Sequence, residues 1–270
     1  MNIARSSQAL ERLLEIMATL RSPEGCPWDA EQTPKSLKPF LLEETYEVLE
    51  AIDHGDPGGI RDELGDLLLQ VVFQARIFEE RGDFDFSDVA GAISEKLIRR
   101  HPHVFERGKT ESGDLDDQWE RIKADEKAQR GEPATLLAGV PEQLPALLRA
   151  KKVSEKASRV GFDWQESEEV FAKVREELCE FEEARYHQDR AGMERELGDL
   201  LFSIVNLGRF LGIDAEEALR QTVNRFVLRF EHVERTLART GQTFHNSSLE
   251  ELDSLWDEAK RQEAKREPPA

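Results

Sequence analysis

The chain has 270 residues, a charged fraction of 34% and a formal net charge of −19. This length suits two domains of about 100–150 residues each. The negative charge argues against nucleic acid or an anionic membrane as a partner, because the field of the whole protein repels both. It does not exclude a phosphate ligand, since a bound metal ion can reverse the charge locally.

The beginning of the chain predicts a surface helix rather than a targeting segment. Leu10, Leu13 and Leu14 are interrupted by Glu11 and Arg12, which is typical of an amphipathic helix and not of a signal peptide. No apolar run approaches the ~18 residues that a membrane span needs. The two cysteines form no Cys-x-x-Cys pair, so we expect neither a disulfide framework nor a thiolate metal site. A reducing compartment follows, and the sequence predicts a cytoplasmic protein.

Apolar residues recur at helical spacing along most of the chain, and no segment shows the sustained alternation of a strand. Helix starts are signalled by Asp56-Pro57, by Ser167 and by Ser248 with Glu251 three residues later. The predicted fold class is all-α, with two tandem helical bundles. Two stripes are expected to be buried: Ile60, Leu64, Leu67, Leu68, Val71, Val72 and Ala75, and Met193, Leu197, Leu200, Leu201, Ile204 and Val205.

The chain repeats itself. Residues 43–76 match residues 176–209 at a fixed offset of 133, with identity at 16 of the 34 positions. A duplication explains this agreement better than chance does. Glycine and proline cluster between the copies, which is typical of a linker. We therefore predict domains at 1–128 and 146–270, joined by a linker at 129–145.

Each copy contains Glu-Glu-x-x-Glu, a gap of fifteen residues and then Glu-x-x-Asp. Residues three apart on a helix share a face, and the gap is long enough to end one helix and begin another. Two antiparallel helices could then point four carboxylates into one cleft, where their repulsion requires a cation. Oxygen ligands without nearby Cys or His suit Mg²⁺, with Mn²⁺ as an alternative. The predicted ligands are Glu44, Glu47, Glu63 and Asp66 in the first copy and Glu177, Glu180, Glu196 and Asp199 in the second.

The competing interpretation of these acids is a solvated helix face. A single motif of this kind would more often be that, because the chain is rich in acidic residues. The recurrence of both motifs at the same gap, inside apolar stripes, favours a metal site in each copy instead.

Basic and aromatic residues follow each carboxylate set at matching spacings. Cations beside a carboxylate–metal cluster suit a triphosphate, and an aromatic face can stack on a base. Core packing of the tryptophans and surface ion pairs of the cations are the structural alternatives. The first copy contributes Lys96, Arg100, His103, Trp119 and Lys123, and the second Arg225, Arg229, His232, Trp256 and Lys260.

Several motifs together resemble the MazG family over nearly the whole chain. They are Cys-Pro-Trp-Asp at 26–29, Leu-Glu-Glu-Thr-Tyr-Glu at 42–47, Glu-Leu-Gly-Asp-Leu-Leu at 63–68 and 196–201, Arg-Arg-His-Pro-His-Val-Phe at 99–105 and Gly-Phe-Asp-Trp at 161–164. The resemblance implies an all-α NTP pyrophosphohydrolase fold, usually dimeric, that cleaves NTP to NMP and pyrophosphate. It also implies that Glu177, Glu180, Glu196 and Asp199 bind metal. By the same resemblance, Lys173, Asn224, Arg225, Arg229, Trp256 and Lys260 contact the nucleotide, and Arg195 joins this predicted substrate-binding set.

The mechanism expected from these residues is attack of water on the α-phosphorus. A carboxylate not fully used by the metal would accept the proton, and Glu176 and Glu177 are the two candidates. The competing hypothesis is a non-catalytic helical dimer that binds a metal or nucleotide without turnover.

The two copies are expected to be unequal. At the repeat offset, Lys173 becomes Phe40, and in the alignment of the basic motifs Asn224 becomes Glu95. Both changes make the first site more negative, so the second copy is expected to carry most of the activity.

Overall fold

The computed structural model describes residues 2–105 and 135–264. Every regular element within these ranges is an α-helix, which confirms the all-α prediction. The chain divides into two compact units, residues 1–126 and 127–270. The predicted domain limits and the linker at 129–145 stay a prediction, because the segment between the last helix of the first unit and residue 135 lies outside the described residues.

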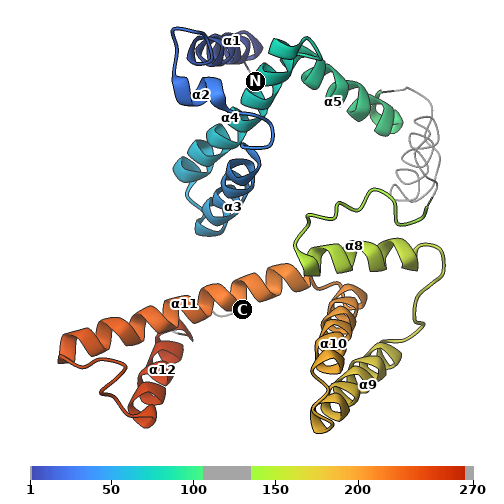
Figure 1. Ribbon diagram of the computed structural model, residues 1–270, viewed down its shortest axis with the longest axis vertical. Helices are drawn as coiled ribbons and strands as arrows, with labels where there is room; N and C mark the ends of the chain where they lie inside the picture. Colours follow the sequence, from blue (N-terminus) through green and yellow to red (C-terminus); the bar gives the residue numbers. More distant parts are fainter. Residues whose placement is uncertain (1, 106–134, 265–270) are drawn as a thin grey trace. The chain divides into compact units, whose positions relative to one another are not determined.

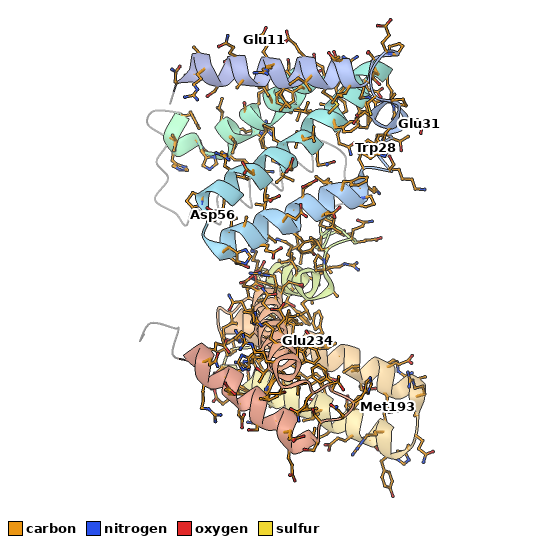
Figure 2. All side chains as sticks on the ribbon, turned by 90° about the vertical axis from the view of Figure 1, so that its left-hand side faces the viewer. Glu11, Trp28, Glu31, Asp56, Met193 and Glu234 are labelled. Carbon is orange, nitrogen blue, oxygen red and sulfur yellow. The ribbon has the colours of Figure 1, made fainter. Side chains whose placement is uncertain are left out.

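The first unit is built around a helical hairpin that is covered on one side by its first helix (Figure 1). Asp56, labelled in Figure 2, stands between the two hairpin helices, and its carboxylate accepts hydrogen bonds from the amides of Gly58 and Gly59 at 3.0 Å. The hairpin turns at Gly55, whose φ of 69° favours glycine. The helices are α1 (Ile3–Leu20), α2 (Pro27–Glu31), α3 (Lys38–His54), α4 (Pro57–Arg81), α5 (Phe86–Arg100) and α6 (Pro102–Phe105).

The second unit repeats the hairpin as α9 and α10 (Figure 1). Asp189 caps α10 through the amide of Gly192. The helix α8 packs against α10 and α11, while α12 packs against α11. The helices are α8 (Ala146–Ser158), α9 (Ser167–Tyr186), α10 (Arg190–Phe210), α11 (Ala215–Thr240) and α12 (Leu249–Ala264).

Two of the predicted helix starts are confirmed without change and one is displaced by a residue. Asp56 caps α4, and Ser248 and Glu251 form reciprocal hydrogen bonds before α12. At α9 the capping box is formed by Glu166 and Glu169, so that Ser167 is the first helical residue instead of the cap.

The expectation that both apolar stripes are buried is wrong in part. Val72, Ala75 and Val205 are buried, and their burial stabilises the two hairpins. The outer halves of the stripes are exposed, because a hairpin covers only one side of each helix within its own unit. These exposed residues are Leu64, Leu68, Val71, Leu197, Leu201 and Ile204.

The buried faces contain polar side chains that the apolar pattern does not reveal. Gln70, Ser203 and Asn206 are all buried. Asn206 accepts a hydrogen bond from Arg209 at 2.7 Å, and Arg209 forms an ion pair with Asp163, which lies before α9. This pairing attaches the loop before the second hairpin to α10. Among the described helices, none combines the length and apolar character that crossing a bilayer requires.

Asp214 connects α8 to the start of α11 and is expected to stabilise the second unit. Its carboxylate caps α11 through the amide of Glu217 and accepts a 2.6 Å hydrogen bond from Lys151. These contacts, with the Lys151 bond as the largest cause, hold the pKa of Asp214 below its usual value. Asp214→Ala is expected to lower the free energy of unfolding by about 1 kcal/mol in urea titrations at neutral pH.

The pH dependence of this effect follows from the lowered pKa of Asp214. The contribution is fully present above the pKa of the unfolded carboxyl and is lost as the pH falls through the lower folded pKa. The difference between the parent protein and the variant should therefore shrink below about pH 4. A variant with unchanged stability at neutral pH would contradict this role of Asp214.

Candidate active site

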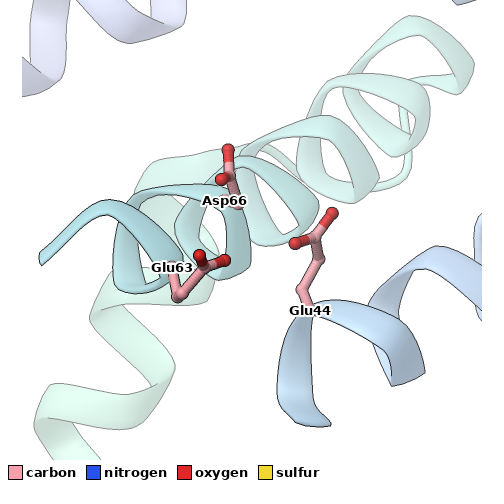
Figure 3. Close-up of side chains that lie close together, drawn as sticks. All are labelled: Glu44, Glu63 and Asp66. Carbon is pink, nitrogen blue, oxygen red and sulfur yellow. The ribbon is translucent and has the colours of Figure 1, made fainter. Parts of the chain in front are cut away.

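The first hairpin brings carboxylates of α3 and α4 together. Glu44 from α3 points toward Glu63 and Asp66 from α4 (Figure 3), and one oxygen of each lies within 4.8 Å of the others. Glu47, the fourth predicted ligand, is outside this group of three but shares a hydrogen bond with Glu44. Desolvation, the hydrogen bond to Glu47 and the charge of Asp66 raise the pKa of Glu44. Desolvation, followed by the charges of Glu47 and Asp66, also raises the pKa of Glu63.

The second hairpin forms the equivalent group. Glu177 from α9 and Glu196 and Asp199 from α10 each offer an oxygen within 4.8 Å of the other two. Glu177 is 5% exposed, although it carries a carboxylate. Glu180 lies outside the group of three, but desolvation and then the charges of Glu177 and Glu196 raise its pKa. The structure therefore brings three of the four predicted ligands of each copy into one group and leaves the fourth within electrostatic reach.

Both groups fit a hard divalent cation by their chemistry. All their donors are carboxylate oxygens, which are the ligands that Mg²⁺ and Mn²⁺ prefer. Desolvation and neighbouring carboxylates raise the pKa values of Glu44, Glu63 and Glu180, and a bound cation would supply positive charge beside them.

Lys173 provides a cation inside the second site. Its ammonium lies 2.8 Å from Glu176 and 2.7 Å from Glu177, one turn further along α9. The hydrogen bonds to Glu176 and then Glu177 raise the pKa of Lys173, so the side chain is charged at neutral pH. Glu177 is almost fully buried, whereas the side chain of Glu176 is 56% exposed.

Five further predicted nucleotide contacts lie on α11 and α12: Asn224, Arg225, Arg229, Trp256 and Lys260. Arg229 forms a 2.7 Å ion pair with Glu263, and its guanidinium stacks over the ring of Trp256 at 5.9 Å. Arg225 donates to Thr222 at 2.8 Å, Lys260 pairs with Asp257 at 3.1 Å, and Asn224 is exposed.

These groups do not meet the carboxylates within one chain. Among the described residues, no hydrogen bond or ion pair joins Arg225, Arg229 or Lys260 to the carboxylates of the α9–α10 hairpin. The helix α12 packs against α11 and not against the hairpin (Figure 1). The structure thus brings Lys173 to the carboxylates and leaves the α11–α12 set elsewhere. Trp119 and Lys123, predicted as their first-copy equivalents, lie outside the described residues.

Arg195 lies at an open hollow beside the second carboxylate group. The hollow has a volume of about 400 Å³ and is formed by the end of α9 and the start of α10. The sequence predicted Arg195, Glu180 and Glu196 as site residues. It did not point to two further titratable residues that line the hollow, Glu183 and His187. Their identity with Glu50 and His54 at the repeat offset was a signal that could have found them. The complete lining is Glu180, Glu183, Ala184, His187, Asp189, Gly192, Arg195 and Glu196.

Two helical hairpins, one in each unit and each carrying a group of three carboxylates that could hold a cation, define an all-helical protein with one acidic site in each repeat. The family model described as the MazG nucleotide pyrophosphohydrolase domain matches residues 32–105 and 165–234, which contain both hairpin carboxylate groups. This chain belongs to the MazG family.

Curated relatives cover nearly the whole chain. A Thermotoga maritima protein named nucleoside triphosphate pyrophosphohydrolase/pyrophosphatase MazG is 48% identical over 250 residues, which are 93% of this chain and 95% of the relative. The nucleoside triphosphate pyrophosphohydrolase of Escherichia coli is also 48% identical, over 94% of this chain and 98% of its own length. An uncharacterized Bacillus subtilis protein, YabN, is 45% identical over 92% of this chain and 51% of its own length.

Proposed function

We propose that this chain hydrolyses nucleoside triphosphates, canonical or aberrant, to nucleoside monophosphate and pyrophosphate, with the second repeat as the main active site. The names of the Thermotoga maritima and Escherichia coli relatives support the reaction. The observation that carries the proposal is the group of Glu177, Glu196 and Asp199 with the charged Lys173 beside it. Together these residues offer ligands for a divalent cation and a separate cation for a phosphate.

Mg²⁺ is the proposed metal, with Mn²⁺ as a substitute, held by Glu177, Glu196, Asp199 and the nearby Glu180. When bound, it would neutralise phosphate oxygens and lower the pKa of a water molecule. Lys173 and Arg195 are the cations of the hairpin itself that would hold phosphate oxygens.

Glu176 is the proposed proton acceptor. Both Glu176 and Glu177 were candidates in the sequence, but Glu177 is buried within the carboxylate group and Glu176 is exposed beside it. Water would form the new bond to the α-phosphorus while the bond from that phosphorus to the bridging oxygen breaks. Glu176 would take the proton of the water, and pyrophosphate would leave with the electron pair.

The released product should be pyrophosphate and not orthophosphate. Orthophosphate detection with an NTP and Mg²⁺ is expected to stay near background until inorganic pyrophosphatase is added. EDTA in excess over the metal should abolish pyrophosphate release, because without the metal the carboxylates and the triphosphate repel each other. Direct orthophosphate release would contradict the reaction, and nucleotide binding without turnover would favour a non-catalytic binding protein instead.

We further propose a homodimer in which α11 and α12 of one copy face the hairpin of the other. Two observations support it. Large apolar side chains of the hairpin and of α11 are exposed within one chain, among them Leu197, Leu201, Phe226 and Leu228, and a partner would bury them. In addition, Arg229 and Trp256 are separated from the carboxylates within their own unit, so that a partner would complete the site.

Two further proposals concern the partners and the cellular location of the protein. A net charge of −19 supports the absence of a nucleic-acid partner. Cys26 and Cys179 are free thiols, which supports a cytoplasmic location.

A further inference from the structure

Lys173 has two carboxylate partners, and one of them is also a proposed metal ligand. Its ammonium lies 2.7 Å from an oxygen of Glu177, and Glu177 belongs to the group with Glu196 and Asp199. A carboxylate that already neutralises an ammonium ion attracts a second cation less strongly, and the ammonium itself repels that cation. The side chain of Lys173 is only 34% exposed, so water screens this repulsion incompletely.

Among the described residues of the first repeat, no lysine or arginine forms the equivalent ion pair with the carboxylate group. Phe40 stands at the position of Lys173 and packs against the hydrophobic core around Met17 and Leu37. Its ring also contacts Trp28 edge to face, at 5.8 Å between centroids. In the described part of the first unit, none of the ion pairs involves a carboxylate of the Glu44 group. The cation nearest in sequence, Arg61, pairs instead with Asp62 at 2.6 Å.

We infer that Lys173 competes with the divalent cation for Glu177, so that the first repeat is the tighter metal site in the absence of substrate. The second repeat then takes up metal together with phosphate, because phosphate oxygens give Lys173 another partner and release Glu177. The inference rests on the proposed function for the identity of the site and adds an order of binding to it. The two repeats thereby differ in role: one holds metal constantly, and the other binds metal when substrate arrives.

The energetic basis is a linkage between two ligands. If Lys173 weakens metal binding at Glu177, an anion that attracts Lys173 must strengthen metal binding. By linkage, the metal must strengthen binding of that anion by the same factor. Inorganic pyrophosphate is a suitable anion, since it is the proposed product and is not a substrate of the proposed reaction. The first repeat, with Phe40 in place of the lysine, should lack this coupling.

The test measures Mn²⁺ binding by electron paramagnetic resonance in full-length proteins that retain one site. Glu44→Gln with Glu47→Gln leaves the second site, and Glu177→Gln with Glu180→Gln leaves the first. Without phosphate, the first site is expected to bind Mn²⁺ about tenfold more tightly than the second. Adding Lys173→Met to the protein that retains the second site should tighten its Mn²⁺ binding by about the same factor, whereas Lys173→Arg, which keeps the charge, should not.

Pyrophosphate provides the second readout. It should tighten Mn²⁺ binding at the second site, after correction for the binding of Mn²⁺ by pyrophosphate in solution, and Lys173→Met should remove most of this gain. A protein with all four Glu→Gln changes is the control for binding elsewhere on the acidic surface. Equal Mn²⁺ affinities of the two sites, or a Lys173→Met variant that binds Mn²⁺ no more tightly, would overturn the inference and leave the proposed reaction intact. If neither one-site protein binds Mn²⁺ more tightly than the control with all four changes, the inference and the metal assignment both fail. The pyrophosphate-release assay tests the proposed reaction separately.

Discussion

Replacing Glu177 and Glu180 by glutamine is expected to lower the rate of pyrophosphate release by at least ~100-fold. Glu177 is the buried member of the carboxylate group and Glu180 its close electrostatic neighbour. Glutamine keeps the size of both side chains, but it replaces one accepting oxygen of each carboxylate by a donating NH2 group and removes two negative charges that would hold the metal. The measurement is the initial rate with saturating NTP and Mg²⁺, coupled to inorganic pyrophosphatase.

The matched control is Glu44→Gln with Glu47→Gln in the first repeat, which should stay within a few-fold of the parent rate. The first site lacks the cation of Lys173 because Phe40 stands there, and Asp62 stands where the second repeat has Arg195. Since a triphosphate is repelled by uncompensated carboxylates, the first hairpin should bind it less well. Circular dichroism should confirm that both variants are folded. Comparable losses of rate in the two variants would refute the asymmetry, and a loss only in the first-repeat variant would mean that the repeats have the opposite roles.

A mixed dimer of two inactive variants is expected to recover about half of the parent rate per dimer. One subunit would carry Glu177→Gln with Glu180→Gln, and the other Arg229→Ala, which alone should cost about 100-fold as the loss of a phosphate-binding cation. If Arg229 serves the hairpin of the partner, one of the two sites in the mixed dimer contains every intact group. Two affinity tags on co-expressed chains would isolate this species, and its initial rate would be compared with that of the parent dimer.

Two results would contradict this arrangement. A mixed dimer as inactive as its parents would mean that Arg229 acts within its own chain. Light scattering at micromolar concentration is expected to give about twice the chain mass of 30.9 kDa, and a mass near that of one chain would contradict the dimer itself.

The local chemistry of the chain is readable in its sequence because it depends on short-range spacing. The helical class follows from apolar periodicity, and the start of α4 follows from Asp56 before Pro57. The carboxylate groups follow from the recurrence of Glu44, Glu63 and Asp66 at one offset, since residues three apart on a helix must share a face. The duplication supports the prediction of these groups. In a chain this acidic, a single motif would more often be a solvated helix face, whereas two motifs with the same gap favour a common site.

Only the tertiary structure decided which groups actually meet. The stripe from Leu64 to Ala75 reads as uniformly apolar, yet Leu64 is exposed and Val72 is buried, because the packing partner and not the helical period selects the covered side. Basic motifs that follow the acids at matching spacings suggested one continuous site. In the second repeat, however, α11 carries Arg229 away from the hairpin, and Trp256 lies beside Arg229 on α12, while Lys173 lies against Glu177. Periodicity determines the face that a residue occupies on its helix, whereas the distance between faces of different helices is set by long-range packing.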